Sequence, residues 1–450
     1  MVAFACYPEP WTMVASTGAS PTAPVSNMGL YDWSNMTYRS TSLTAGFTVL
    51  STCATPIDCV ALVGTNLRQY DAVRIRIGAT QAAAEGEGTA LVDIQMPAWS
   101  GVKTDIKAPM TVLLLPQAVQ GKYVRVDVTA TGHPAGYVEI GSLVVGSAVR
   151  EEGVGTGAEL SINDPSSIIS NAGFNFADRF PVGQSYKASF PYVTERSLRA
   201  QWHPMLAKAG NTKPVLFVPN YELKANVNLL RDSQTMASAN GWTTSGAMTW
   251  TRNADYGPDG SLTASTIYDG STTALAYALG SAAISTDVAS YTASVYIKKG
   301  VGPIARLLVE YTGGTTSSTA VNVDPATGAT SVAGTVVDAG DYWRVWRPIT
   351  NNGANTAVRI RMYPAMSPAG SALTASDVAS VGTNVFAFPQ ITTGSGLVDW
   401  CPTSQTATAD THYAAMQQND AVFGVVSKAT SKLLYYDICS VDITVLSSSL

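Results

Sequence analysis

Residues 123–129 have the sequence YVRVDVT, in which hydrophobic and polar side chains alternate. The run VRIRI at 73–77 has the same pattern, with three aliphatic side chains and two arginines. Because successive side chains of a strand point to opposite faces, each run predicts a strand with one buried and one solvated face. Such strands are typical of antiparallel β-sandwiches, and the chain is predicted to be mainly β.

The composition agrees with this fold class. The chain has 450 residues, which is enough for two to four domains. Only 13% of the residues are charged, against about 25% in a typical soluble domain, so few charges are available for the polar faces of surface helices. The 27 basic and 32 acidic residues give a net charge of -5. Without a basic surplus to contact phosphates, no nucleic-acid partner is expected.

The cysteines and the N-terminus indicate a protein that folds inside a cell. The five cysteines form no CxxC motif, so they predict free, buried thiols rather than a zinc site or a disulfide framework. A bridge between Cys53 and Cys59 across a turn is the lesser alternative. Pro8 and Pro10 interrupt the first residues before a signal-like hydrophobic segment can form, and no apolar run approaches the roughly 18 residues of a membrane span. A soluble product without membrane insertion is expected.

Three domains are expected along the chain. Residues 1–150 contain several alternating runs and predict one β-sandwich. Residues 226–405 contain a second series of short strands, which predicts a jelly roll. The segments 151–225 and 406–450 each lack the strands for a core of their own. We therefore predict that they form one discontinuous α+β domain, with the jelly roll inserted between them. The alternative is a C-terminal strand pair that is swapped onto a neighbouring subunit.

One short helix is expected near 194–209. Thr194 is a suitable N-cap, hydrophobic residues follow at helical spacing, and Gly210 is a suitable residue just beyond the helix. Pro204 lies in the middle of this segment and is expected to bend or break the helix, because proline lacks a backbone N–H.

The sequence contains no recognisable catalytic or metal-binding motif. There is no HExxH, no GxSxG elbow and no Walker loop. The three histidines lie far apart and are expected to be structural: His133, His203 and His412. Several acidic residues lie in turns, where capping explains them: Asp259, Asp324 and Asp341. We expect no enzyme, no cofactor and no metal. The alternative is a polysaccharide-degrading enzyme, which would need two carboxylates facing each other across a groove.

Aromatic residues are concentrated in the segment 226–405. Sugar rings stack their C–H faces on aromatic rings, so an exposed tryptophan on a β-sandwich is a candidate saccharide platform. Most tryptophans of such sandwiches fill the core instead, and this is the competing interpretation for each of them. The candidates for glycan binding are Trp242, Tyr342, Trp343 and Trp346.

Ordered motifs in the same segment carry a family resemblance. They are NLL at 228–230, GPDGSLTA at 257–264, YTASVYIK at 291–298, VDPATG at 323–328, DYWRV at 341–345 and FAFPQI at 386–391. In this order they resemble the carbohydrate-binding-module-like jelly rolls of tailed-bacteriophage virion proteins. The segment departs from that pattern at Pro389, where a small residue is common, and at its last residues, 399–402. The resemblance therefore implies a fold more strongly than a particular sugar site.

Two further resemblances concern the rest of the chain. CVALVGTNL at 59–67, VRIRI at 73–77 and GKYVRV at 121–126, with EIG at 139–141, resemble a discoidin or galactose-binding-like sandwich. KPVLFVP at 213–219 and AVFGVV at 421–426 resemble the framing strands of phage tail-tip or minor tail proteins.

These resemblances imply a structural component of a tailed-phage virion. It would belong to the tail tip, the baseplate or the minor tail proteins, and it would assemble in the host cytoplasm. Its partners would be other virion proteins and copies of itself in a ring or lattice. The inserted jelly roll would face outward and is a candidate for binding host-surface polysaccharide. The alternative in the same class is a head decoration or collar protein.

Overall fold

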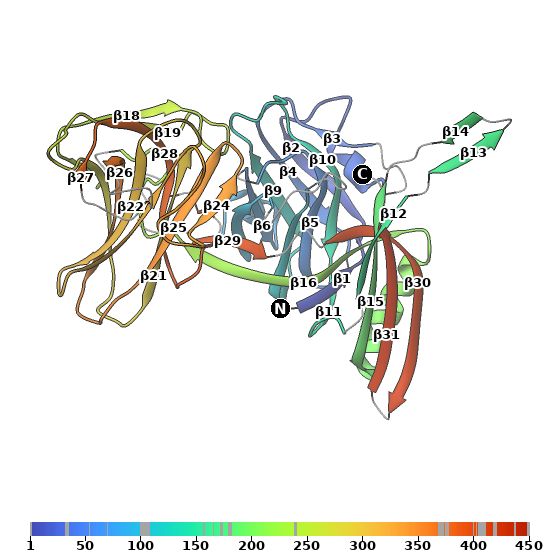
Figure 1. Ribbon diagram of the computed structural model, residues 1–450. Coiled ribbons are helices and arrows are strands. Elements are labelled where there is room, and N and C mark those ends of the chain that lie inside the picture. Colours follow the sequence, from blue (N-terminus) through green and yellow to red (C-terminus); the bar gives the residue numbers. More distant parts are fainter. Residues whose placement is uncertain are drawn as a thin grey trace. The chain divides into compact units, whose positions relative to one another are not determined.

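The computed structural model describes most of the chain (Figure 1). The described residues are 2–31, 36–53, 55–69, 71–99, 109–155, 158–164, 166–171, 174–178, 182–237, 241–367, 373, 378–398, 400–401, 403, 411–416, 421–435 and 438–447. The chain divides into two compact units. Unit 1 consists of residues 1–224 and 413–450, and unit 2 consists of residues 225–412. Both are built from antiparallel sheets, so the expected mainly β fold with several sandwiches is confirmed.

The first part of unit 1 is a β-sandwich of two sheets. One has the order β2 (Trp11–Thr17), β4 (Thr44–Ser51), β9 (Tyr123–Thr129), β6 (Ala72–Gly78) and β7 (Val92–Pro97). The other has the order β3 (Tyr38–Arg39), β10 (Glu139–Gly146), β5 (Ile57–Thr65) and β8 (Thr111–Val119). In β9, Val124, Val126 and Val128 are at most 1% exposed, while the residues between them are half-buried. The alternation predicted at 123–129 is thus confirmed.

A larger sheet joins strands from both ends of the chain. Its order is β11 (Ala148–Glu151), β1 (Val2–Cys6), β16 (Pro214–Val227), β30 (Val422–Tyr435), β31 (Ile438–Ser447), β15 (Gly183–Thr194) and β12 (Glu159–Asn163), and β29 (Thr411–Met416) also pairs with β16. The strands β30 and β31, which follow unit 2 in sequence, pair with β16 and β15, which precede it. Unit 2 is therefore inserted between two parts of unit 1.

The two faces of this sheet belong to different cores. Phe4 and Leu216 pack with the valine and isoleucine side chains of the sandwich. Ala5 and Phe217, their neighbours along the strands, pack instead with Trp202 from the helical segment. Because side chains alternate along a strand, the same strands serve as a wall for both cores. A separate hairpin is formed by β13 (Ser167–Asn171) and β14 (Phe174–Asp178).

The predicted helix extends from Glu195 to Ala209 in three parts: α2 (Glu195–Ser197), η2 (Leu198–Trp202) and α3 (His203–Ala209). Thr194 caps it as predicted, because its hydroxyl accepts a hydrogen bond from the backbone N–H of Ser197 at 3.1 Å. Pro204 does not end the helical segment, but the regular α-helix is interrupted directly before it. The turn before it is a π-helix, whose wider spacing accommodates a residue that cannot donate a backbone hydrogen bond.

Two further short helices were not predicted: η1 (Val25–Gly29) and α1 (Gln81–Glu85). Among the helices of the described residues, none has both the length and the apolar character needed to cross a bilayer.

Unit 2 is a second sandwich of two antiparallel sheets. One sheet has the order β17 (Thr243–Ser245), β20 (Tyr277–Ala283), β26 (Ala357–Ser367), β22 (Ile304–Thr312) and β23 (Ser317–Val323), and β27 (Val378–Ala379) pairs with β26. The other has the order β18 (Met248–Asp255), β19 (Ala264–Asp269), β28 (Gly382–Thr393), β21 (Ser290–Lys298), β25 (Tyr342–Thr350) and β24 (Val336–Ala339). A single hydrophobic core lies between them.

The first and last segments of unit 2 are tied together by Asn228, which is fully buried. Its side-chain oxygen accepts hydrogen bonds from the N–H groups of Leu230 and Ile391, at 3.1 and 3.2 Å. Its side-chain nitrogen donates to the carbonyl of Cys401 at 3.0 Å. The domain boundary expected at 405 lies outside the described residues, as do the closing residues Asp399 and Pro402.

Candidate functional site

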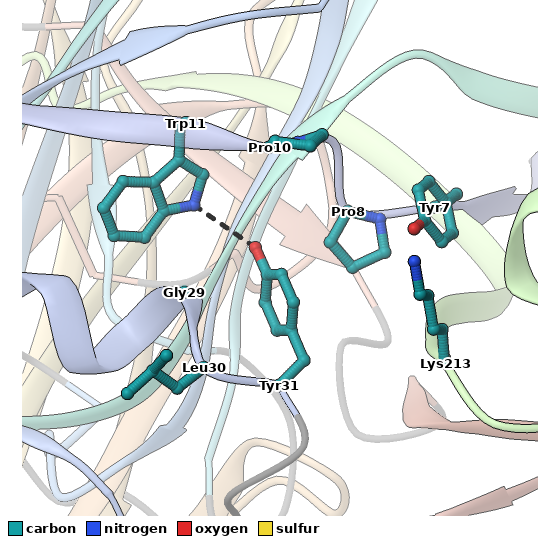
Figure 2. A pocket seen from close by; sticks show the side chains of 8 residues that line it. All are labelled: Tyr7, Pro8, Pro10, Trp11, Gly29, Leu30, Tyr31 and Lys213. Atoms are coloured by element: carbon teal, nitrogen blue, oxygen red, sulfur yellow. Dashed lines mark hydrogen bonds between the residues drawn. The ribbon is translucent and has the colours of Figure 1, made fainter.

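The candidate binding site is a cavity in unit 1 of about 290 Å³, shown in Figure 2. We call it the aromatic pocket, and it is lined by Tyr7, Pro8, Pro10, Trp11, Gly29, Leu30, Tyr31 and Lys213. Its volume is at the lower end of the roughly 300–1,000 Å³ of small-molecule sites. The pocket therefore suits a ligand of about one ring rather than an extended chain.

The pocket forms where the chain passes from one sheet to another. Tyr7 follows β1 and Trp11 begins β2, and two of the three residues between them are prolines, which cannot extend the ladder of β1. Glu9 fixes this connection, because its backbone N–H donates to the carbonyl of Val145 at 2.9 Å. Gly29 ends η1 so close to Trp11 that an added Cβ would lie 3.3 Å from the indole ring.

Hydrogen bonds hold the two largest rings of the pocket in place. The Trp11 indole N–H lies 3.2 Å from the Tyr31 hydroxyl and 3.3 Å from the carbonyl of Leu143. The Tyr31 hydroxyl donates to the same carbonyl at 2.7 Å. Burial raises the pKa of Tyr31, so its phenol stays neutral at physiological pH. The hydrogen of this hydroxyl is thus used in a bond within the protein, so Tyr31 offers a ligand its ring face.

The charged group of the pocket is Lys213, at the opposite side from Trp11 and next to Tyr7 in Figure 2. Lys213 is exposed and forms no ion pair with the described residues. The neighbouring cation, Lys208, is different: its ammonium lies 2.5 Å from the Glu9 carboxylate. No carboxylate or imidazole lines the cavity, so its described residues lack an acid and base pair for hydrolysis. The arrangement suits binding of a polar ring by aromatic faces and one ammonium.

A second cavity of unit 1, of about 610 Å³, is more polar. It is lined by residues 150–155, 190–194, Ser197 and Gln201. Glu151 is one of the two acids that line it, with Glu152. The Glu151 carboxylate accepts hydrogen bonds from the Trp202 indole at 2.7 Å and from the Ser197 hydroxyl at 3.1 Å. These bonds hold the helix against β11, which gives Glu151 a structural role.

Two of the four aromatic residues predicted to bind glycan are buried in unit 2. Trp242 is 1% exposed, and its indole N–H donates to the carbonyl of Arg231 at 2.8 Å. Tyr342 is also 1% exposed, and its hydroxyl donates to the carbonyl of Tyr256. A stacking platform needs an exposed ring face, so neither ring can serve as one. Trp242 fills the core, whereas Tyr342 is buried on the outer face of β25, which it shares with Trp346.

The other two candidates are half-buried and lie on opposite faces of β25. Trp343 packs against the core of unit 2, donates to the carbonyl of Pro325 at 3.0 Å, and has the Lys299 ammonium 4.0 Å from its ring centroid. Trp346 lies on the outer face, opposite Ser294 of β21. The four residues therefore do not form one platform, and only Trp346 keeps the environment expected for a surface ring.

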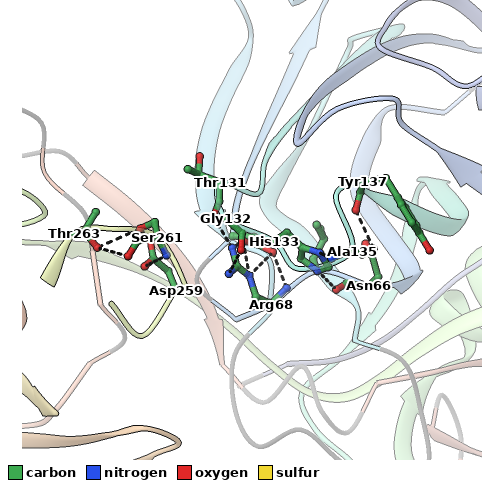
Figure 3. Close-up of polar contacts among 12 residues, drawn as sticks. Asn66, Arg68, Thr131, Gly132, His133, Ala135, Tyr137, Asp259, Ser261 and Thr263 are labelled. Atoms are coloured by element: carbon green, nitrogen blue, oxygen red, sulfur yellow. Dashed lines mark hydrogen bonds and ion pairs between the residues drawn. The ribbon is translucent and has the colours of Figure 1, made fainter. Parts of the chain in front are cut away.

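One of the three histidines, His133, and two of the turn acids, Asp259 and Asp324, have side-chain hydrogen bonds within the protein, and Figure 3 shows the first two of these residues. The Nδ1 atom of His133 accepts from the N–H of Ala135 at 3.2 Å, so its Nε2 donates to the carbonyl of Asn66 at 2.8 Å. Asp259 accepts from the N–H and hydroxyl of Ser261, at 3.0 and 2.5 Å. Asp324 likewise accepts from the N–H of Ala326 at 2.9 Å.

The five cysteines are free, and four of them are buried. Cys53, the exception, does not bridge to Cys59. Within the described part of the chain, no three side chains of His, Cys, Asp or Glu converge as metal ligands would.

The comparisons with known proteins give distant structural similarities. No protein-family model and no curated protein matches the chain. The chitosan-binding module 1 of a chitosanase/glucanase from Paenibacillus sp. IK-5 matches 32% of this chain and 97% of its own length, at 13% identity and a TM-score of 0.23. A CBM32 module of a family 31 glycoside hydrolase from Clostridium perfringens matches 31% of this chain and 96% of its own length, at 10% identity and a TM-score of 0.22.

A truncated AlyQ with CBM32 and alginate lyase domains matches 86% of this chain and 100% of its own length, at 13% identity and a TM-score of 0.22. None of these three structures is a virion protein. The chain is thus distantly similar in structure to carbohydrate-binding modules of the CBM32 type, while its mainly β fold rests on the sheets described above.

Proposed function

We propose that this protein binds saccharide and has no catalytic activity of its own. The observation that carries the proposal is the aromatic pocket. Two hydrogen-bonded rings, Trp11 and Tyr31, are held rigidly at its wall, so little conformational entropy is lost when a ligand stacks on them. Lys213 adds a donor at the opposite side. A sugar ring has an apolar C–H face and polar hydroxyls at its rim, and this combination matches the pocket.

The biological setting that we propose is a tailed-phage virion, with copies of this chain and other virion proteins as partners. The support is the ordered set of motifs in unit 2 and the low content of charge. Weakly charged sheet surfaces lose little solvation when they pack against a neighbouring subunit. In this setting the protein would attach the particle to host-surface polysaccharide. Electron microscopy of intact particles, with an antibody against unit 2, tests this part, and labelling of the head rather than the tail would favour the alternative of a decoration protein.

The test of the pocket is isothermal titration of the full chain with galactose, glucosamine and glucuronic acid as monosaccharide probes. We expect at least one of the three to bind. Lys213→Gln should weaken this binding several-fold, because it removes the charged donor of the pocket. The variant should still fold, because Lys213 is exposed. Trp11→Ala should weaken it at least about tenfold, as expected for loss of a stacking ring. Trp343→Ala in unit 2 is the matched control and should leave the affinity unchanged.

Loss of binding in the control as well, or no binding of any probe by the wild type, would contradict the pocket as the site. The non-catalytic part is tested separately. Prolonged incubation with polysaccharide should release no new reducing ends, and their appearance would favour the enzyme alternative.

A further inference from the structure

A second ligand surface is suggested by the outer face of one sheet of unit 2, which we call the arginine face. It consists of Tyr277, Arg306, Glu310, Arg359, Arg361 and Tyr363. In β26, Val358, Ile360 and Met362 point into the core and are fully buried. The alternate residues of the strand therefore share the opposite face.

The strand register brings the other members beside them. In the pairing of β22 with β26, Glu310 lies opposite Arg359 and Arg306 lies opposite Tyr363. On the other side of β26, Leu279 of β20 lies opposite Arg361. Three arginines and one glutamate thus occupy neighbouring positions of a single sheet face.

The positive charge on this face is only partly balanced. The Glu310 carboxylate lies 2.5 Å from the Arg361 guanidinium and 3.8 Å from the Arg359 guanidinium, so two cations share one anion. The Nε atoms of both arginines have no hydrogen-bond partner among the described residues. At the accessible positions two guanidinium groups thus face one carboxylate, which is a surplus of one positive charge in a chain whose net charge is -5. Such a surplus attracts an anion.

Aromatic rings lie between the cations. The Arg361 guanidinium lies 4.6 Å from the centroid of the Tyr277 ring, and the Tyr277 and Tyr363 rings are 5.0 Å apart at an angle of 52°. Tyr277 is half-buried, as are Leu279 and Leu308 beside it. The side chain of Arg359 is 38% exposed and that of Arg361 is 23% exposed, whereas Arg306 and Tyr363 are buried at the other end of the face. The accessible part thus combines two guanidinium groups with an apolar and aromatic floor.

We propose that the arginine face binds an acidic saccharide chain, with guanidinium groups on its carboxylate, phosphate or sulfate groups and sugar rings on the apolar floor. Arginine suits this role because its planar fork binds such anions in a bidentate manner. The accessible positions lie on the neighbouring strands β20, β26 and β22, so more than one sugar unit of a chain can contact them. Nucleic acid is disfavoured, because a surplus of one charge is small beside the 6–10 phosphate contacts of typical DNA-binding proteins. This proposal does not depend on the aromatic pocket.

The experiment is titration of the full chain with four oligomers of similar length: oligogalacturonate, a sulfated dextran, neutral cellohexaose and single-stranded DNA. We expect both acidic saccharides, or one of the two, to bind at least about tenfold more tightly than cellohexaose and DNA, with an affinity that falls as salt rises. A preference between the two tells carboxylate from sulfate recognition. Binding of cellohexaose or DNA as tightly as the acidic saccharides overturns the proposal.

Variants locate the binding. Arg359→Gln, at the most exposed position, and Arg361→Gln should each weaken binding of the acidic oligomer several-fold, and Arg361→Lys should retain part of it. Arg199→Gln removes one charge from an exposed ion pair in unit 1 and is the matched control. Lys213→Gln should have no effect, which separates this site from the pocket. If Arg361→Gln unfolds unit 2, the test rests on Arg359→Gln, provided that its melting curve is unchanged. Unaltered binding by Arg359→Gln then overturns the proposal.

Discussion

The rings of Phe388 and Trp400 stack face to face, with centroids 3.6 Å apart and planes 8° from parallel. Phe388 belongs to β28, and Trp400 belongs to the last segment of unit 2. Trp400 is 3% exposed, so this stack covers the outer side of a sheet whose other side faces the core. The segment that ends unit 2 is thus packed onto it.

Replacing Trp400 by alanine should destabilise unit 2 by about 3–5 kcal/mol, because a buried aromatic ring is lost and a cavity is left. Urea unfolding followed by circular dichroism measures the change. Tyr256→Ala is the control, since that side chain is 64% exposed and its loss should cost less than about 0.5 kcal/mol. Equal effects of the two substitutions would show that the stack contributes nothing.

Unit 2 should fold by itself. Residues 225–412 have their own core, and their first and last segments are joined through Asn228. We expect the isolated segment to unfold cooperatively, with a midpoint close to that of the corresponding transition in the full chain. The complementary chain, with Lys224 joined to Tyr413 by a short linker, should keep its β circular dichroism. Aggregation of both products would contradict independent units.

An ion pair of the sandwich should make stability depend on pH. Arg74 donates two hydrogen bonds to Asp93, at 2.7 and 2.6 Å, and these bonds lower the pKa of Asp93. The folded pKa is then below the unfolded value of about 3.9, so the contribution is complete above that pH and is lost as the pH falls through the folded pKa. Both side chains are more than 40% exposed, which limits the contribution to about 0.5 kcal/mol.

The measurement is urea unfolding of the wild type and of Asp93→Asn at a series of pH values from about 7 downward. The difference in the free energy of unfolding should be largest near neutral pH and should shrink as the pH falls through the folded pKa of Asp93. Glu87→Gln, at an exposed acid, should show no difference at any of these pH values. A difference for Asp93→Asn that persists in acid would exclude titration of the pair as its cause.

The thiols should differ in reactivity. Cys53 is half-buried, whereas Cys6, Cys59, Cys401 and Cys439 are buried. A hydrogen bond with Cys59 and burial both raise the pKa of Cys6, which lowers its thiolate fraction. With an aromatic disulfide reagent, one thiol per chain should react in the native state and the other four only after unfolding. Cys53→Ser should abolish the fast phase, and a fast phase that survives it would refute this assignment.

The sequence indicated the sheets more reliably than the site. The alternation at 73–77 and 123–129 shows which side chains are buried, because the two faces of a strand follow from neighbouring residues in the sequence. The capping by Thr194 could be predicted for the same reason. Pro204 indicated an interruption of the helix, but the sequence did not show that this interruption is a π-turn rather than a break. Trp242 and Trp346 look alike in sequence, and only the tertiary fold assigns the first to the core and the second to the outer face of β25.

The aromatic pocket was missed for a related reason. Its residues come from three distant parts of the chain, 7–11, 29–31 and 213, and only the tertiary fold joins them. The sequence contained one signal, the run YPEPW at 7–11, in which two prolines separate two aromatic residues and interrupt strand pairing between them. The arginine face is different, because the run VRIRMY at 358–363 already places two arginines and a tyrosine on one side of a strand.

The bonds of Asn228 also bear on how this chain could have been assembled in evolution. When the two ends of an inserted domain are held together, closing the loop that contains it costs the recipient domain about as much conformational entropy as closing a short loop. This cost does not depend on the length of the inserted domain. The sheet of unit 1 can then keep its fold when unit 2 is exchanged for another domain of different size or specificity. Recombination at the borders of unit 2 would therefore replace one recognition surface while leaving the scaffold intact.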